Sequence, residues 1–176
     1  LKIYKHSVIR ENRLDFPEHI FYEDNCAGPL WSLYFRHFAR VEEPLYYYYQ
    51  HAVSTVHHIT EEKCRDRMKA AELLYTGCRD RGFLAEYRQE IEYRFTELYY
   101  AITLFSYMSG VKKPKISFIR ELRQGTEKYF PEFDQNKYYL QHTGVEEQKL
   151  IAMQRKSDLR FYLYYRLRQF VWKLRA

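Results

Sequence analysis

Helical periodicity over residues 84–108 is the feature that most constrains the fold of this chain. Apolar side chains recur there every three or four residues, so they fall on one face of a helix. Such a face is stable only when it packs against other elements and leaves water. Gly110 suits the end of this helix. The stripe consists of Leu84, Tyr87, Ile91, Phe95, Leu98 and Ile102.

A second helix is predicted over residues 61–80. Thr60 is placed to cap it, and Glu61 and Glu62 lie favourably close to the positive end of the helix dipole. Gly82 suits its end, because glycine adopts the left-handed conformation that stops helices. The buried stripe of this helix is Met68, Ala71, Leu74 and Tyr75.

Helical patterns continue to the end of the chain. Further helices are predicted over 117–129, 145–155 and 158–175, the first and last of them capped by Ser117 and Ser157. From residue 60 onward we therefore predict a helical, bundle-like C-terminal extension, and the fold class as a whole is mainly α.

The part before residue 60 has a different pattern. Residues 1–13 indicate a short helix or turn, and residues 25–37 a helix. Residues 38–42 and 45–50 are typical of two short strands, separated by Glu43-Pro44. We therefore expect a small β-hairpin near the N-terminus.

Size and composition favour a soluble globular protein of one domain, or one domain with helical appendages. The 176 residues are 46% hydrophobic and 30% charged, and the formal net charge is +6. This charge suits anionic partners, including anionic lipid, nucleic acid and nucleoside diphosphates. Three cysteines without a Cys-x-x-Cys pattern indicate reduced thiols and a cytoplasmic protein. The chain lacks an initiator Met and begins in mid-pattern, so we expect a truncated protein.

Two segments near the N-terminus carry the strongest functional signal. The first is Phe16-Pro17-Glu18-His19-Ile20-Phe21-Tyr22-Glu23-Asp24-Asn25, where two adjacent carboxylates follow an apolar-aromatic run. The second is Glu43-Pro44-Leu45-Tyr46-Tyr47-Tyr48-Tyr49-Gln50-His51-Ala52-Val53-Ser54-Thr55, a tyrosine run that leads into a polar turn. Together they resemble the C-terminal half of bacterial family 2 glycosyltransferases, enzymes of the GT-A fold.

The resemblance implies that residues 1–59 are the acceptor-side part of a GT-A catalytic domain, followed by the helical extension 60–176. Members of the family begin with a nucleotide-binding half that ends in an Asp-x-Asp motif. This sequence has neither that motif nor an alternating strand–helix start, so we expect that half to be missing. The implied reaction is inverting transfer of a sugar from a nucleotide sugar to a glycan or lipid-linked acceptor, as in polysaccharide and cell-envelope glycan synthesis.

The resemblance also implies roles for single residues. Asp24 would be the base that accepts the proton of the acceptor hydroxyl, and Glu23 would be its neighbour, in contact with the acceptor or the backbone. His51 would bind the Mn²⁺ or Mg²⁺ ion that neutralises the leaving diphosphate in the full-length enzyme; we expect no ion bound to this part alone. Donor or acceptor contacts would come from Ser54, Thr55 and Tyr48.

Simpler interpretations of these residues stay open. Asp24 or Asn25 could cap the helix that follows, and His51 could be a surface turn residue. Enough candidate ligands for a zinc site are present, but the sequence spacings between them match no zinc signature. Its members would be His51, His57, His58, Cys26 and Cys64.

The C-terminal segment 158–175 mixes aromatic, apolar and basic residues. Its cations are Arg160, Arg166, Arg168, Lys173 and Arg175. A basic helix rich in aromatics can lie at an anionic membrane surface, or it can pack on its own domain with the Arg and Lys stems covering apolar surface. One stripe comprises Leu159, Leu163, Leu167, Phe170 and Leu174.

The leading hypothesis is thus a fragment of an inverting glycosyltransferase that is cytoplasmic, with peripheral contact to the inner face of the membrane left open. Its partners would be a nucleotide sugar and a glycan acceptor, and apolar surface left by the missing half would make the fragment a homo-oligomer. The alternative is a non-catalytic helical module for interaction or membrane-surface binding. A nucleic-acid binder is disfavoured, because acidic residues are interspersed and no binding motif is present.

Overall fold

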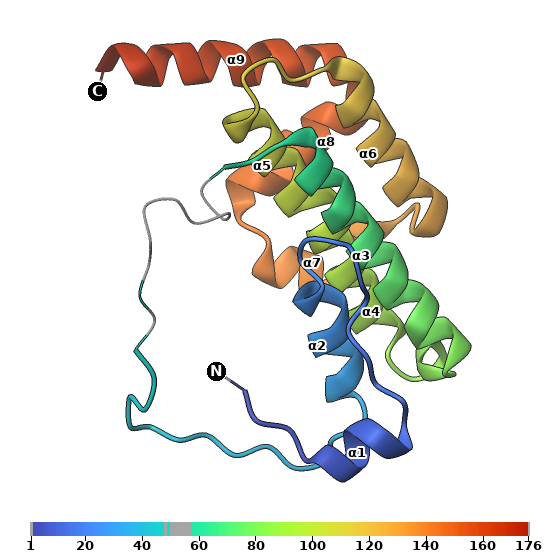
Figure 1. Cartoon of the computed structure of the whole chain (residues 1–176). Coiled ribbons are helices and arrows are strands. Elements are labelled where there is room, and N and C mark those ends of the chain that lie inside the picture. The colour runs from blue at the N-terminus through green and yellow to red at the C-terminus, as the bar shows by residue number, and fades with distance from the viewer. Residues whose placement is uncertain (1, 48, 50–57, 176) are drawn as a thin grey trace.

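The computed structural model describes residues 2–47, 49 and 58–175, and all regular elements among these residues are helices (Figure 1). The predicted mainly α class is confirmed. The elements are α1 (His6–Glu11), α2 (Asp24–Ser32), α3 (Glu61–Asp80), η2 (Phe83–Ala85), α4 (Arg88–Phe95), η3 (Thr96–Ile102), α5 (Thr103–Gly110), α6 (Ile116–Tyr129), η4 (Phe133–Gln135), α7 (Lys137–His142), α8 (Val145–Lys156) and α9 (Asp158–Arg175).

The bounds of α3 coincide with the predicted helix 61–80, because local signals at both ends fix them. The Thr60 hydroxyl oxygen accepts the backbone N–H of Lys63 at 3.2 Å, as an N-cap does. Gly82 follows the last turn with φ of 79°, a conformation that costs other residues far more than glycine.

Elements α4, η3 and α5 form one continuous helix from Arg88 to Gly110, in which η3 is a π-helical stretch. The Thr103 hydroxyl donates to the carbonyl of Leu98, five residues back, at 2.7 Å. The wider turn of a π-helix rotates the residues that follow it. Ile102, predicted in the buried stripe, is therefore 39% exposed, whereas Tyr100 is fully buried.

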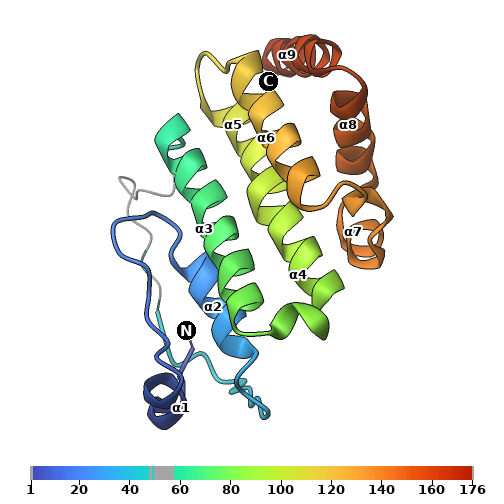
Figure 2. The same ribbon diagram turned by 90° about the vertical axis from the view of Figure 1, so that its right-hand side faces the viewer.

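Three long helices lie side by side and enclose the core (Figure 2). They are α3, the helix from Arg88 to Gly110, and α6. Helix α2 packs on α3, while α8 and α9 pack against each other and α9 against α6. Aromatic and aliphatic side chains from all these helices pack together in the core. Among the fully buried ones are Leu74, Phe95, Leu104, Tyr107, Phe118, Ile119 and Phe161.

The predicted β-hairpin is absent from the described part of residues 38–50. Residues 36–47 carry no regular element and form no backbone hydrogen bonds with other described segments. A strand needs a neighbouring strand to satisfy its backbone groups, and the described residues supply none. Strand-like sequence alone therefore did not produce a hairpin here.

A buried polar cluster joins η3, α6, α8 and α9. Gln154 is fully buried; its side-chain oxygen accepts the Tyr100 hydroxyl at 2.8 Å and its nitrogen donates to the Ile119 carbonyl at 2.6 Å. At the start of α9, the Asp158 carboxylate accepts Nε–H of Arg123 at 3.0 Å and Nε–H of Arg120 at 3.1 Å. These bonds fix where α9 leaves the bundle.

Gly125 allows α6 to approach Tyr99 closely. A Cβ atom at Gly125 would lie 2.2 Å from the Tyr99 hydroxyl oxygen. We predict that Gly125→Ala lowers the free energy of unfolding by roughly 1–3 kcal/mol, because the clash outweighs the better helix propensity of alanine. Urea unfolding followed by circular dichroism measures the change.

Gly28→Ala in α2 is the matched control, because a Cβ atom there would lie 3.8 Å from its nearest neighbour, Nζ of Lys2, and the backbone is helical. We expect this variant to be neutral or slightly stabilising. Equal effects of the two substitutions would contradict the packing described for Gly125.

Asp158 gives the stability of the fold a pH dependence. Burial alone would raise the pKa of this carboxyl, but hydrogen bonds from Arg123 and Arg120 outweigh it and hold the pKa below its usual value. A lowered pKa stabilises the fold above the pKa of the unfolded chain, and that contribution is lost as the pH falls through the folded pKa.

We therefore predict that Asp158→Asn lowers the free energy of unfolding by about 2 kcal/mol at pH 7. The difference from the wild type should shrink below about pH 4. Urea unfolding at both pH values tests this, with Asp80→Asn, an exposed carboxylate beside Arg79, as the control expected to change little. A difference that is independent of pH would contradict it.

Candidate functional site

Glu23 and Asp24 lie at the surface where α2 begins, and both are exposed. The Glu23 carbonyl accepts the backbone N–H of Ala27 at 3.0 Å, but the Glu23 carboxylate forms no capping bond. The Asp24 carboxylate forms no hydrogen bond or ion pair with a described residue. Neither Asp24 nor Asn25 is the cap of α2, so in the part of the chain that the structure describes the Asp24 carboxylate has no structural role.

The loop before this pair is held against α3 by three contacts. The backbone N–H of Phe21 donates to Oδ2 of Asp66 at 3.0 Å. The Arg67 guanidinium lies 4.3 Å from the ring centroid of Tyr22, and Nζ of Lys63 lies 5.3 Å from that of Phe21. Each cation over a ring adds attraction at close range, so the three contacts together hold the loop in place.

Two of these contacts have unusual features. Tyr22 has a φ of 66°, which is strained for a residue with a side chain, so the surrounding contacts must hold it there. Arg67 is only 6% exposed, and its Nη1 has no hydrogen-bond partner among the described residues. Neither Asp66 nor Arg67 was predicted from the sequence, since neither belongs to a motif.

The other predicted site residues cannot be placed relative to this pair. His51, Ser54, Thr55 and Tyr48 lie outside the described residues, and so does His57. Within the described part of the chain, no group of three His, Cys, Asp or Glu side chains is arranged to hold a metal ion. The metal and donor contacts implied by the resemblance therefore stay predictions.

All three cysteines are buried in the helical core as free thiols. Burial raises the pKa of Cys26, Cys64 and Cys78 to about 11 in each case. Such thiols are protonated at neutral pH, whereas a metal ligand or nucleophile must be a thiolate.

We predict that the folded protein reacts with Ellman's reagent at pH 8 at least roughly a hundredfold more slowly than the protein in urea. Glutathione in the same buffers controls for effects of urea on the reagent. One thiol equivalent that reacts rapidly in the folded protein would contradict the burial of the three cysteines.

The segment 36–47 follows α2 and runs away from the helices (Figure 1). Much of its apolar side-chain surface is exposed. Tyr47 is 83% exposed and Leu45 79%, and Phe38, Val41 and Tyr46 are exposed as well. An exposed apolar surface of this kind usually marks a site that a partner covers. This segment contains the described part of the predicted hairpin and of the second sequence motif.

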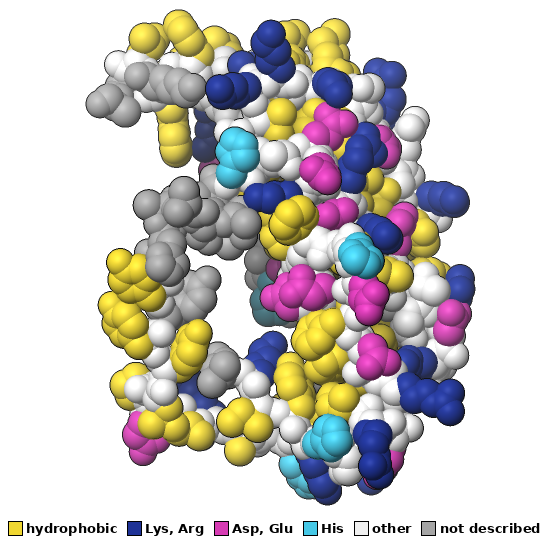
Figure 3. Space-filling view, viewed as in Figure 1, with side chains coloured by type: hydrophobic (Ala, Val, Ile, Leu, Met, Phe, Trp, Pro, Cys, Tyr) yellow, Lys and Arg dark blue, Asp and Glu magenta, His cyan; other side chains and the backbone are white. Residues whose placement is uncertain are grey.

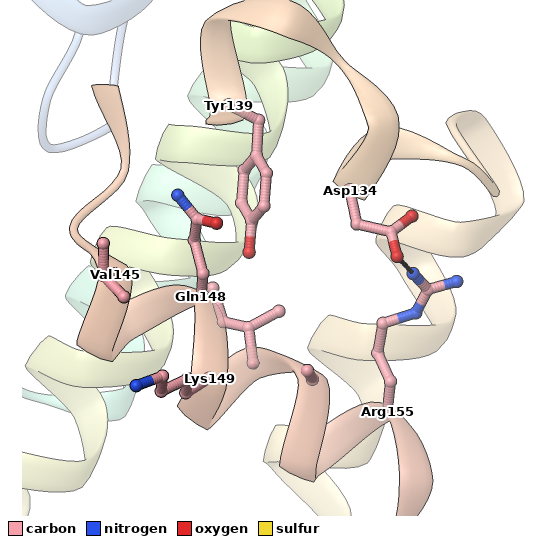
Figure 4. Close-up of a pocket in the computed structure, with 8 residues that line it drawn as sticks. Asp134, Tyr139, Val145, Gln148, Lys149 and Arg155 are labelled. Carbon is pink, nitrogen blue, oxygen red and sulfur yellow. Dashed lines mark ion pairs between the residues drawn. The ribbon is translucent and has the colours of Figure 1, made fainter. Parts of the chain in front are cut away.

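A surface hollow of about 360 Å³ lies beside α8 (Figure 4). Its lining includes Tyr139, Gln148 and Lys149, and an ion pair between Asp134 and Arg155 crosses one side. Arg155 also binds Glu127, so its charge is already neutralised by the protein. The hollow is open to solvent and holds no unpaired acid–base couple, so we assign no chemistry to it.

Helix α9 has two different faces. Its inner face packs on the bundle: Phe161 is fully buried, Tyr165 lies against Phe105, and the Gln169 amide donates to the Met108 carbonyl at 2.9 Å. Its outer face is exposed and apolar, and it carries the stripe noted in the sequence. Among the described residues, no helix is both long enough and apolar enough to span a membrane.

Comparisons of this chain with protein-family models, with curated proteins and with solved structures found no match. The glycosyltransferase resemblance therefore rests on the two sequence segments alone.

Proposed function

We propose that this chain is the acceptor-side part of an inverting family 2 glycosyltransferase, which moves a sugar from a nucleotide sugar to a glycan or lipid-linked acceptor. One observation carries the proposal. The Asp24 carboxylate is exposed and has no partner among the described residues, and it lies at the end of a loop that is held against α3 by three separate contacts. A carboxylate that is both free and positioned is what a general base requires.

The reaction needs one proton to be removed. The acceptor hydroxyl attacks the anomeric carbon, the bond from that carbon to the diphosphate breaks, and the hydroxyl proton passes to a base. Asp24 takes the proton, and Glu23 beside it accepts a hydrogen bond from a neighbouring acceptor hydroxyl. Because the loop is anchored at Phe21 and Tyr22, the carboxylate keeps its place as the acceptor arrives.

The divalent ion implied by the resemblance has one expected ligand in this chain, His51, which lies outside the described residues. The described residues alone do not supply a set of ligands for it. The proton transfer at Asp24 does not need the ion, which when bound would neutralise charge on the leaving diphosphate.

The exposed segment 36–47 supports the same proposal. Its sequence favours strands, its backbone is unpaired in the described part, and its aromatic side chains are exposed. These are the properties of strands cut from a sheet, because a strand obtains its hydrogen bonds and its packing from neighbours. The nucleotide-binding half of a GT-A domain would provide such a sheet.

The alternative function, a non-catalytic module that binds a partner or a membrane, is favoured by a different observation, the exposed apolar face of α9. The two functions are compatible, since α9 and the acidic pair belong to different parts of the molecule.

An assay of sugar transfer by the full-length protein tests the proposal. The assay contains Mn²⁺ and a panel of nucleoside-diphosphate sugars. We predict that Asp24→Asn lowers the transfer rate by roughly 10²–10⁴ while donor binding is retained. Asp80→Asn, an exposed carboxylate elsewhere, should leave the rate unchanged.

Full activity of Asp24→Asn would remove Asp24 from the reaction. Absence of transfer and of donor hydrolysis by the wild type with every donor would overturn the proposal and favour the non-catalytic module.

A further inference from the structure

The outer face of α9 presents an unbroken apolar stripe to solvent. Its members follow one another at intervals of four, four, three and four residues, which places them within an arc of about 80° around the helix. They are between 54% and 70% exposed, so the bundle does not use this face. The stripe consists of Leu159, Leu163, Leu167, Phe170 and Leu174.

Positive charge borders this stripe. Arg160 lies on one side of it and Arg166 on the other, and both are exposed. Lys112, in the loop before α6, lines a surface hollow together with Arg166 and Trp172, so the loop adds its charge to the same side. The acidic residue of α9, Asp158, is buried against Arg123 and Arg120 and does not face outward.

The shape of the molecule leaves this face accessible. Helix α9 runs along one edge, and its C-terminal end extends beyond the other helices (Figure 1). Apolar and basic side chains gather along that edge, with the acidic ones in view below it (Figure 3). A flat surface can therefore approach α9 without meeting the rest of the bundle.

We propose that the outer face of α9 binds the surface of an anionic lipid bilayer. The apolar stripe enters the boundary between headgroups and acyl chains, and the flanking cations attract anionic headgroups. Phe170, within the stripe, supplies an aromatic ring of the kind that such interfacial helices bury on their apolar face. The proposal is independent of the glycosyltransferase proposal, because it uses other residues.

A second copy of the chain fits this face less well. Face-to-face packing of two α9 helices would bring the cations that flank one stripe against those that flank the other. An anionic bilayer instead meets the cations with opposite charge. The charge along α9 thus selects the membrane over self-association.

Co-sedimentation of the full chain with vesicles tests the proposal. We expect binding to phosphatidylcholine vesicles with roughly one-third phosphatidylglycerol, and at least about tenfold weaker binding to pure phosphatidylcholine. The affinity for anionic vesicles should fall on going from roughly 0.05 M to 0.5 M NaCl, because salt screens the attraction.

Two variants separate the apolar and the electrostatic contributions. Leu163→Gln with Phe170→Gln should weaken binding at least about tenfold, and Arg160→Glu with Arg166→Glu by a similar factor. The controls are Leu140→Gln, also half exposed but on α7, and Lys69→Glu on α3, both expected to bind like the wild type. Circular dichroism confirms that each variant is folded.

Equal binding to neutral and anionic vesicles, or wild-type binding by either pair of α9 substitutions, would overturn the proposal. A second result would also overturn it: the wild type does not bind vesicles, sedimentation equilibrium shows that it is a dimer, and Leu163→Gln with Phe170→Gln abolishes this dimer. That last result would assign the stripe to a second copy.

Discussion

The buried amide of Gln154 is the contact on which the arrangement of the C-terminal half depends. Its oxygen accepts a hydrogen bond from the Tyr100 hydroxyl on η3, and its nitrogen donates one to the Ile119 carbonyl on α6. A buried amide group without a hydrogen-bond partner destabilises the fold. Both bonds form only when α8 has one particular axial position relative to η3 and α6. The start of α9, two residues beyond the end of α8, is fixed by the same constraint together with Asp158.

The π-helical stretch explains how Tyr100 reaches that amide. In an uninterrupted α-helix, the buried stripe would continue from Leu98 to Ile102 and leave Tyr100 off the core face. The wide turn over Thr96–Ile102 rotates the chain, buries Tyr100 and exposes Ile102. It also directs Tyr99 toward Gly125, where the absence of a side chain lets α6 lie close. One local irregularity thus determines two interhelical contacts.

Sequence patterns predicted the elements whose ends are set locally. The bounds of α3 follow from Thr60 and Gly82, and Ser157 does cap α9, where its hydroxyl oxygen accepts the N–H of Arg160 at 3.2 Å. Ser117 was the wrong cap, since α6 begins one residue earlier without a side-chain cap. Helix α2 ends at Ser32, well short of the predicted residue 37.

Features that depend on distant residues were not predictable in this way. The π-helical stretch has no composition signal, and Asn136, which caps α7 and donates to the Gln89 carbonyl at 2.9 Å, was not recognised as a helix start. At the candidate site, the sequence identified the acidic pair, but not the residues that hold it, because Asp66 and Arg67 meet the loop only in the folded chain.

The fold also relates the two proposed surfaces to each other. Asp66, which holds the loop before Asp24, is five residues after Glu61, or about 7.5 Å along α3. Glu61 in turn binds Nζ of Lys115 at 3.0 Å, in the loop whose Lys112 lies beside Arg166 of α9. The loop before the acidic pair is therefore held by the N-terminal part of α3, and the first residue of α3 is joined by an ion pair to the loop beside α9.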